Sequence, residues 1–308
     1  MLVERRNGFD LTGEQLMSIN EMVSPLIAKG QSPYHIKQAL GDSLVVSEAT
    51  LRRMVAKCEL DVRNIDLRNV VSRKPRNRNH AGLHQEVINQ QKIGHTYKDY
   101  LSYTAEHEVT AIQMDCVEGK KEDSAVLLTL HFPAFHMQLA FIMNEHTADC
   151  VIHTLDMLEE VLGTELFRQV FPTILTDNGH EFADVFRMER SINGGKRTKI
   201  FFCEPNRSDE KGACENNHRF IRYVIPKGTS LEPFVQADIN LMMNHINSMF
   251  RKTLYGKSPY DVAMAVLPED FFILLGLEKI SPAEVTLKPN LIAKKGKYIA
   301  LHNPSCLL

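Results

Sequence analysis

The chain reads AIQMDCV at residues 111–117, SAVLLTLHF at residues 124–132 and HMQLAFIM at residues 136–143. The three runs are short and apolar, and the connecting residues EGKKED and FPAF contain turn formers. Apolar runs of this length between turn residues are typical of β-strands, and short connections favour antiparallel neighbours. We therefore predict three consecutive antiparallel strands that begin a sheet.

The segments after residue 143 alternate between helix and strand. Helical spacing of apolar residues is seen in TADCVIHTLDMLEEVLG (147–163), ACENNHRFIRYVI (213–225) and residues 234–250. The apolar runs FPTILTD (171–177) and KIFFC (199–203) indicate two further strands. Three strands, a helix and then alternating strands and helices are the order of the ribonuclease H type of α/β fold. We expect a mixed five-stranded sheet with flanking helices.

Three helices are expected ahead of the sheet. Apolar residues recur at helical spacing in residues 11–28, in GQSPYHIKQAL (30–40) and in VSEATLRRMVAKC (46–58). Ser47 is a typical N-cap for the last of these helices. A short helix, a tight connection and a capped basic helix predict a helix-turn-helix, although a plain helical hairpin without DNA has the same pattern.

Basic residues are concentrated locally. The net charge is only −2, but the segment from Arg52 to Arg78 holds nine Lys or Arg and three acids. Such a segment in a nearly neutral chain is typical of a DNA path, or of a solvated lysine-rich surface. The stretch RNVVSRKPRNRNH (68–80) favours DNA, and ERSINGGKRTK (189–199) is a further candidate. The predicted DNA contacts are Ser47, Thr50, Arg52, Arg53, Arg73, Lys74, Arg76, Arg78 and Lys211.

The composition limits the class of protein. The chain has 308 residues, of which 44% are hydrophobic, as in ordinary globular proteins. No run of about 18 apolar residues is present, and the start MLVERRNGFD is polar. We therefore expect neither a membrane span nor a secretory signal, and we expect a cytoplasmic, nucleoid-associated protein.

The six cysteines are scattered without a C-x-x-C pair, which is typical of reduced thiols. The most zinc-like cluster is His146, Cys150 and His153. Thr147 is a plausible N-cap, however, and it leaves His146 outside the helix that carries the other two. We expect ordinary packing there rather than a zinc site.

Three acids stand where strands or helices meet the edge of the predicted sheet. Asp115 lies near the end of the first strand, Asp177 ends the fourth strand in TDNGHEF, and Glu215 lies in the first turns of a helix. An acid in an apolar strand is costly to bury without a partner or a metal. Three carboxylates that converge would repel one another without a cation. Oxygen-only ligands select Mg²⁺, with Mn²⁺ as a substitute, and two such ions suit phosphoryl transfer.

Each acid also has a structural explanation. Asp177 suits a DNG turn, Asp115 suits a pair with a lysine, and Glu215 suits the positive end of a helix dipole. Together, in these strand and helix contexts, the three explanations are much weaker than a shared metal site. Glu181 and Glu210 compete with Glu215 for the third position, although Glu181 is close in sequence to Asp177.

The chain resembles the insertion sequence thirty family of transposases, within the wider DDE transposase and retroviral integrase superfamily. The matching stretches are MDCVEG around Asp115, LTDNGHEF around Asp177 and KGACENNHRFIRYVIPKGT around Glu215. KSPYDV, GQSPYHIKQAL and VSEATLRRMV are also similar to the family, and the resemblance spans residues 30–265. The stretch around Glu215 is the most specific because it is long and unusual.

The resemblance implies a function for each part of the chain. Asp115, Asp177 and Glu215 would be the DDE triad that holds the metal ions, and no other cofactor is implied. The front helices would bind terminal inverted repeats, and the core would cut DNA and join it to target DNA. Asn216 and Arg222 would be motif residues of the catalytic helix. Homo-oligomers on paired DNA ends are expected.

The predicted domains are a helix-turn-helix DNA-binding domain (1–68), a basic linker (69–105), a ribonuclease H-like integrase core (106–268) and a C-terminal tail (269–308). Two alternatives remain open at this point. One is a catalytically silent DNA-binding protein derived from a transposase. The other is a ribonuclease H-like nuclease that cuts DNA without joining it.

Overall fold

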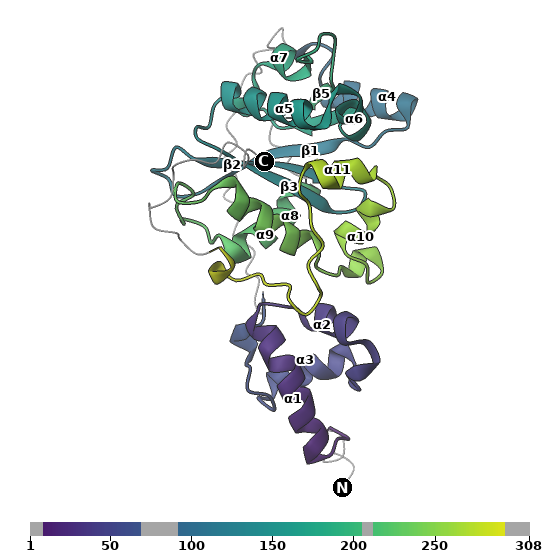
Figure 1. The fold of residues 1–308 in the computed structure, drawn as a ribbon, viewed down its shortest axis with the longest axis vertical. Helices are drawn as coiled ribbons and strands as arrows, with labels where there is room; N and C mark the ends of the chain where they lie inside the picture. Colours follow the sequence, from purple (N-terminus) through teal and green to yellow (C-terminus); the bar gives the residue numbers. More distant parts are fainter. Residues whose placement is uncertain (1–8, 69–91, 205–211, 293–308) are drawn as a thin grey trace.

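The computed structural model describes residues 9–68, 92–204 and 212–292. The first range forms a front domain of helices, and the other two form a larger core around one sheet (Figure 1). The front domain contains α1 (Gly13–Ala28), α2 (Pro33–Leu40), the 3-10 helix η2 (Gly41–Ser43), α3 (Glu48–Ala56) and the 3-10 helix η3 (Asn64–Asp66). The predicted helical front is confirmed.

Side-chain caps set the starts of the front helices. Thr12 and Gln15 form a capping box, in which Thr12 Oγ1 accepts from the Gln15 amide at 3.2 Å. Ser32 and Ser47 cap α2 and α3 in the same way, each accepting from a backbone amide three residues on. The helices enclose a small core that includes Ile19, Val23, Ile27, Ile36, Leu44, Leu51, Met54 and Val55.

The core sheet has five strands in the order β3-β2-β1-β4-β5. Its strands are β1 (Ile112–Glu118), β2 (Val126–Phe132), β3 (Met137–Met143), β4 (Thr173–Thr176) and β5 (Lys199–Phe202). The first three strands pair antiparallel, whereas β1 pairs with β4 and β4 with β5 in parallel. This is the mixed five-stranded sheet that the sequence predicts.

Helices cover both faces of the sheet. The helices are α4 (Tyr97–His107), α5 (Ala148–Leu162), α6 (Thr164–Val170), α7 (Val185–Glu189), α8 (Gly212–Val224), α9 (Gln236–Asn247), α10 (Pro259–Met264) and α11 (Glu269–Leu274), with the 3-10 helices η5 (His180–Phe182), η7 (Lys252–Leu254) and η8 (Pro289–Leu291). One core cluster joins alternate strand residues to α5 and α6, and a second joins the opposite strand face to α8 and α9. The predicted flanking helices are therefore present on both sides.

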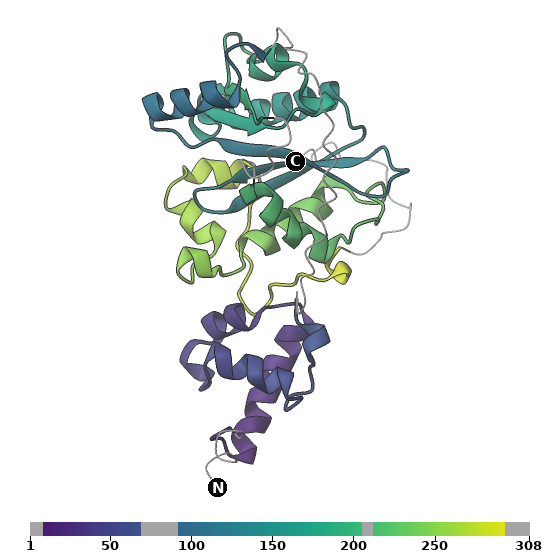
Figure 2. The ribbon, with the colours of Figure 1, turned by 180° about the vertical axis from the view of Figure 1, so that it is seen from behind.

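Two segments differ from the expected domain division. Part of the range expected as a linker forms α4, whose Tyr97, Tyr100 and Tyr103 pack against Phe201 on β5. Seen from behind, this blue helix lies against the edge of the core (Figure 2). Part of the range expected as a tail also belongs to the core, because Phe271 and Phe272 of α11 are buried in the main cluster.

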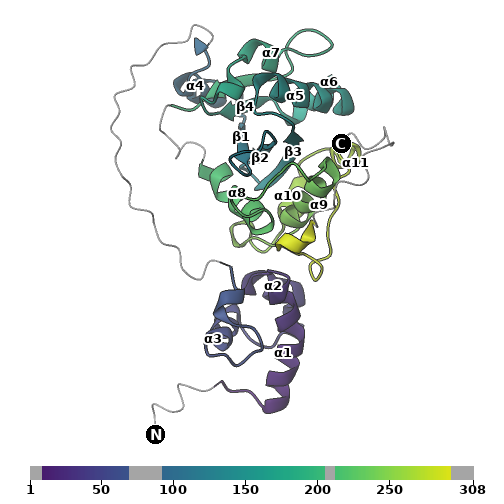
Figure 3. The same cartoon turned by 90° about the vertical axis from the view of Figure 1, so that its left-hand side faces the viewer.

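The front domain docks on the core through α2. Helices α8 and α9 lie between the sheet and the front helices (Figure 3). Gln31 Nε2 donates to the carbonyls of Pro282 and Val285, both at 3.0 Å. His35 accepts at Nδ1 from the Phe250 amide at 3.0 Å, and its Nε2 lies 2.9 Å from the Pro282 carbonyl. Both Gln31 and His35 are buried, so this contact is a packed interface.

In the part of the chain that the structure describes, no helix is both long and apolar enough to cross a bilayer.

Candidate active site

Asp115 on β1 and Asp177, the first residue after β4, lie at matching positions along two neighbouring parallel strands. The β1–β4 ladder pairs Gln113 with Leu175, and each aspartate follows two residues later. Adjacent strands are about 4.8 Å apart, so the two carboxylates emerge side by side at one edge of the sheet. Both side chains are half-buried, and both line one cavity of about 320 Å³. The parallel pairing is therefore what brings together two acids that are distant in sequence.

Backbone amides fix one oxygen of each aspartate. Asp115 Oδ1 accepts from the Cys116 amide at 2.9 Å, and Asp177 Oδ1 accepts from the Gly179 amide at 3.0 Å. Asn178 anchors the same turn by donating to the Cys203 carbonyl at 2.8 Å. These bonds hold the carboxylates at the strand ends in defined orientations.

Lys92 reaches the turn after β4 from outside the sheet. Its Nζ donates to Asn178 Oδ1 and lies over the Phe202 ring, 4.3 Å from the centroid. Burial lowers the pKa of Lys92, and the nearby Asp177 carboxylate opposes that shift. Lys92 is therefore a cation that supports the Asp177 turn, and no sequence motif indicated it.

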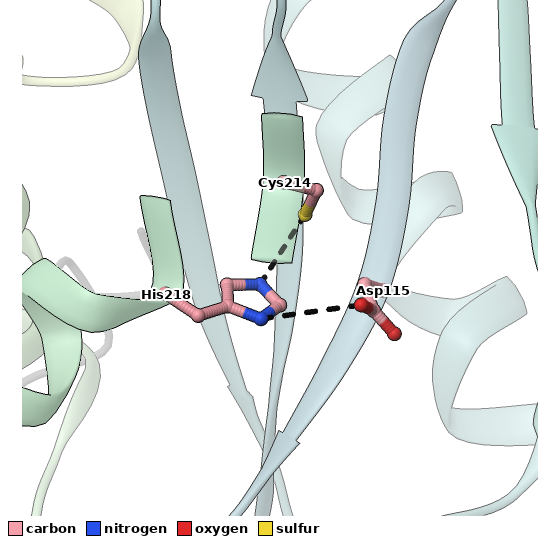
Figure 4. Close-up of side chains that lie close together, drawn as sticks. All are labelled: Asp115, Cys214 and His218. Carbon is pink, nitrogen blue, oxygen red and sulfur yellow. Dashed lines mark hydrogen bonds and ion pairs between the residues drawn. The ribbon is translucent and has the colours of Figure 1, made fainter. Parts of the chain in front are cut away.

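Helix α8 crosses the sheet next to Asp115. Its buried side contains Cys214, Asn217 and Ile221, and the Cys214 amide donates to Gln113 Oε1 at 2.9 Å. His218 Nδ1 lies 3.9 Å from Asp115 Oδ2, and His218 Nε2 lies 3.3 Å from Cys214 Sγ (Figure 4). These contacts fix the rotation of α8 about its own axis.

Glu215 lies in the first turn of α8 and is exposed. It precedes His218 by three positions and Arg222 by seven, so the three side chains project from one side of the helix. His218 faces Asp115, and Arg222 lines the cavity that contains Asp115 and Asp177. Helical spacing thus puts Glu215 on the same side of α8 as His218 and Arg222, but Glu215 does not line the cavity that holds the two aspartates.

The described ranges contain two close groups of possible metal ligands. Asp115, Cys214 and His218 form one group, and Cys116, His146 and Glu181 form the other, with ligand atoms within 4.8 Å of one another. Glu215 is in neither group. Of its two competitors, Glu181 lines the cavity, whereas Glu210 lies outside the described residues.

Two cations share the cavity with the acids. Arg222 Nη2 donates to the Glu118 carbonyl at 2.8 Å, and Lys227 follows α8 at the cavity wall. Burial lowers the pKa of Arg222, although Glu118 opposes the shift. Among the described residues, the buried Arg222 Nη1 has no hydrogen-bond partner. The cavity thus combines carboxylates with donors suited to phosphate oxygens.

Four of the predicted DNA contacts lie on α3 of the front domain or at its N-cap. Ser47, Arg52 and Arg53 are exposed at the start of α3, and Thr50 is half-buried beside them. Arg52 is held by Glu48 at 2.7 Å. The other predicted contacts, Arg73, Lys74, Arg76, Arg78 and Lys211, lie outside the described residues.

His146 lies outside α5, as expected, and its neighbours are Cys116 and Glu181, whereas His153 is exposed.

One expectation from the sequence needs correction. The basic loop before β5 is largely occupied by internal ion pairs. Arg197 is 1% exposed and pairs with Asp156 at 2.5 Å and Glu159 at 3.3 Å, so it is a structural residue and does not offer a DNA contact.

Known proteins resemble the chain over part of its length. No protein-family model matches it. The transposase for insertion sequence element IS1086 of Cupriavidus metallidurans is 30% identical over 95 residues, which are 31% of this chain and 27% of that relative. Transposase InsI for insertion sequence element IS30A of Escherichia coli is 33% identical over 86 residues, which are 28% of this chain and 21% of that relative. The resemblance to insertion sequence transposases is confirmed, and the chain spans about a quarter of the length of these relatives.

Among solved structures, the catalytic core domain of BIV integrase matches 50% of this chain and 93% of its own chain, with a TM-score of 0.37 and 19% sequence identity.

Proposed function

We propose that the chain is a DDE-type DNA transposase, which cuts DNA at the ends of a mobile element and joins those ends to target DNA. The observation that carries the proposal is the parallel pairing of β1 with β4, which brings Asp115 and Asp177 to one cavity. Arg222 and Lys227 line the same cavity. Carboxylates for metal ions beside cations for phosphate oxygens are what phosphoryl transfer requires. The sequence similarity to transposases supports DNA as the substrate.

Asp115, Asp177 and Glu215 are the proposed metal ligands. The fit rests on donor chemistry, because all three offer carboxylate oxygens and two of them share one cavity. Such a set suits Mg²⁺, with Mn²⁺ as a substitute, and it offers enough oxygens for two ions. When bound, the ions supply activation of the attacking oxygen and stabilisation of the leaving oxygen.

The remaining cavity residues have proposed roles in binding and orientation. Arg222, whose Nη2 is engaged by the Glu118 carbonyl, lines the cavity and supplies a positive charge for a phosphate of the DNA strand. Lys227 adds a second positive charge at the same wall. His218 orients Asp115, and Lys92 supports the Asp177 turn. These groups bind and position the substrate or the ligands.

The front domain is proposed to recognise the element ends. Ser47, Thr50, Arg52 and Arg53 at the start of α3 would contact the DNA, with Arg73, Lys74, Arg76, Arg78 and Lys211 as further phosphate contacts. A helix that enters the major groove contacts bases and phosphates with its first turns, which agrees with this placement. Oligomers on paired ends are part of the same proposal.

A strand-cleavage assay with Mg²⁺ and labelled element ends tests the chemistry. Asp115→Ala, Asp177→Ala and Glu215→Ala should each abolish cleavage while DNA binding persists. Glu165→Ala, which removes an exposed acid on α6, is the matched control and should cleave normally. Normal cleavage by Asp115→Ala or Asp177→Ala would overturn the proposal. If Glu181→Gln abolishes cleavage and Glu215→Ala does not, the third carboxylate is Glu181.

A strand-transfer assay separates transposase from nuclease. A pre-cut element end carries the 3′-hydroxyl that attacks target DNA, so joining is measured without prior cleavage. Wild-type protein should join the ends, and the three Ala variants should not. Cleavage without joining would identify a nuclease, and DNA binding without either reaction would identify a catalytically silent protein.

A further inference from the structure

Cys116, His146 and Glu181 form a compact cluster of mixed chemistry beside the proposed catalytic carboxylates. Cys116 lies on β1, His146 lies between β3 and α5, and Glu181 lies in η5. One thiol, one imidazole and one carboxylate therefore meet with ligand atoms within 4.8 Å of one another. All three residues line the cavity that also contains Asp115 and Asp177.

The cluster is on the other face of the sheet from the Asp115–His218 contact. Cys116 is next to Asp115 on β1, and consecutive strand residues point to opposite faces. Cys116 packs against the core cluster built by α5, whereas Asp115 faces His218 and Cys214 of α8. The two groups therefore share no residue and lie on opposite faces of the sheet.

The polar contacts of His146 orient its ring for ligation. Nε2 lies 2.8 Å from Glu181 Oε1, and Nδ1 lies 3.9 Å from Glu118 Oε1. His180 Nε2 lies 2.8 Å from the His146 carbonyl, and His180 Nδ1 lies 3.4 Å from Glu181 Oε2. A metal-binding imidazole commonly donates its other N–H to a carboxylate, and Glu118 is the carboxylate on the Nδ1 side, although the 3.9 Å distance is longer than a hydrogen bond.

Glu181 is a buried carboxylate that needs a positive charge nearby. Its residue is 6% exposed, and its ion pairs within the described residues are with His146 and His180. A Cβ on Gly179 would lie 2.3 Å from Glu181 Oε2, so the carboxylate in this position packs closely against the glycine. Burial of a carboxylate is costly unless a cation or hydrogen-bond donors compensate, and a bound metal ion would supply such a cation.

We propose that Cys116, His146 and Glu181 bind a zinc-like transition-metal ion. Thiolate, imidazole and carboxylate ligands together favour Zn²⁺ over Mg²⁺, and three protein ligands leave a fourth position open to the cavity. Ligand atoms around one zinc ion lie roughly 3.3–3.6 Å apart. Binding of the zinc ion therefore shortens the longer distances between the ligand atoms, whereas the 2.8 Å distance between His146 Nε2 and Glu181 Oε1 increases. The Cys116 thiol loses its proton to solvent on binding.

Cobalt titration of the full chain under thiol-free reducing conditions tests the site. Co²⁺ replaces Zn²⁺ in such sites, and a thiolate ligand gives a charge-transfer absorption that oxygen-only sites lack. Wild-type protein should develop this absorption, saturating with one Co²⁺ per chain, and excess Zn²⁺ should remove it. No absorption, or absorption that Zn²⁺ leaves in place, would overturn the proposal.

Serine variants of three cysteines show which thiol binds the cobalt ion. Cys116→Ser should lose the absorption, whereas Cys150→Ser, on the neighbouring helix, and Cys214→Ser, in the other ligand group, should keep it. Absorption that survives in Cys116→Ser, or that disappears in either control, overturns the assignment. Circular dichroism must first show that each variant is folded.

Two further variants separate this site from its surroundings. Glu181→Gln keeps the shape of the side chain and should weaken Co²⁺ binding by at least about tenfold. Asp177→Asn removes a proposed catalytic carboxylate and should leave the thiolate absorption unchanged. An unchanged Co²⁺ affinity in Glu181→Gln, or loss of the thiolate absorption in Asp177→Asn, would contradict the proposed set of ligands. Because no DNA is present, the outcome does not depend on the proposed transposase activity.

Discussion

His218 Nδ1 lies 3.9 Å from Asp115 Oδ2 (Figure 4), and His218 Nε2 lies 2.9 Å from Thr129 Oγ1. The Thr129 hydroxyl donates to the Asp115 carbonyl at 2.9 Å, so it accepts from the imidazole at Nε2–H. An Nδ1 lone pair would repel the Asp115 carboxylate, so the contact with Asp115 is attractive only in the imidazolium form, which carries a proton on both ring nitrogens. His218 thus ties α8 to β2 through Thr129 and places its ring beside the proposed metal ligand.

Replacing His218 should impair catalysis more than folding or DNA binding. His218→Ala should lower the single-turnover rate of strand cleavage by about 10- to 100-fold, because loss of a group that orients a metal ligand has effects of this size. His218→Gln should recover part of the rate, since its amide can donate to Thr129. His107→Ala, which removes an exposed histidine on α4, is the control. Equal rates for wild type and His218→Ala would show that the contact has no role in the reaction.

Divalent metal should stabilise the folded chain through the two aspartates. Mg²⁺ at about 100 times its dissociation constant adds about 2.7 kcal/mol to the free energy of unfolding. Asp115→Asn and Asp177→Asn should lose most of that increment, because each removes a negative ligand from the shared cavity. Thermal unfolding with and without Mg²⁺ measures the difference, with Glu165→Gln as the control. If Mg²⁺ raises the midpoint of the Asn variants as much as that of wild type, the ions bind elsewhere.

The sequence predicted the sheet and the two aspartates because both signals are local. Apolar runs mark the strands, and Asp115 and Asp177 stand at or near the ends of two such runs. Which strands are neighbours followed from the order of the elements. The parallel β1–β4 pairing then places the two acids at the same level.

The remaining features depend on packing between distant segments. The role of His218 follows from the rotation of α8, which the contact between the Cys214 amide and Gln113 fixes. Tyr100 falls in the range predicted as a linker, but it is partly buried against Phe201. Arg197 belongs to a stretch that looked like a basic loop, but it is buried against acids of α5. The spacing of residues along the sequence does not predict these contacts, because each residue packs against a different helix or strand from its own.

The exposed start of α3 should control affinity for element ends. Arg52→Ala and Arg53→Ala should each weaken binding, and each lost phosphate contact should reduce the slope of log affinity against log salt by about 0.9. Glu48→Gln should strengthen binding, since Glu48 holds Arg52 at 2.7 Å and competes with phosphate for it. Fluorescence anisotropy over a range of salt concentrations measures both quantities. Lys252→Ala removes an exposed cation of the core and is the control. An unchanged affinity and an unchanged slope in both Arg variants would mean that α3 faces solvent in the complex.

Acid should weaken the docking of the front domain through His35. The ring accepts at Nδ1 from the Phe250 amide, so Nε2–H donates to the Pro282 carbonyl and the docked imidazole is neutral. Burial lowers the pKa of His35, the bond to Pro282 opposes this shift, and the charge of Arg68 adds to it. An exposed imidazole keeps a pKa of about 6.5. The docked state is therefore fully favoured above that pH and loses stability as the pH falls below it, by about 1.4 kcal/mol for each unit of pKa difference.

His35→Gln removes the titrating group, so its thermal midpoint should fall less than that of wild type between about pH 7 and pH 5. The comparison must be made between slopes, because His131, His136 and His245 also have lowered pKa values and make both proteins sensitive to acid. His107→Gln, far from the interface, should keep the wild-type slope. If His35→Gln and wild type lose stability in parallel, the His35 imidazole does not remain neutral at the interface and the docking is held by the Gln31 contacts instead.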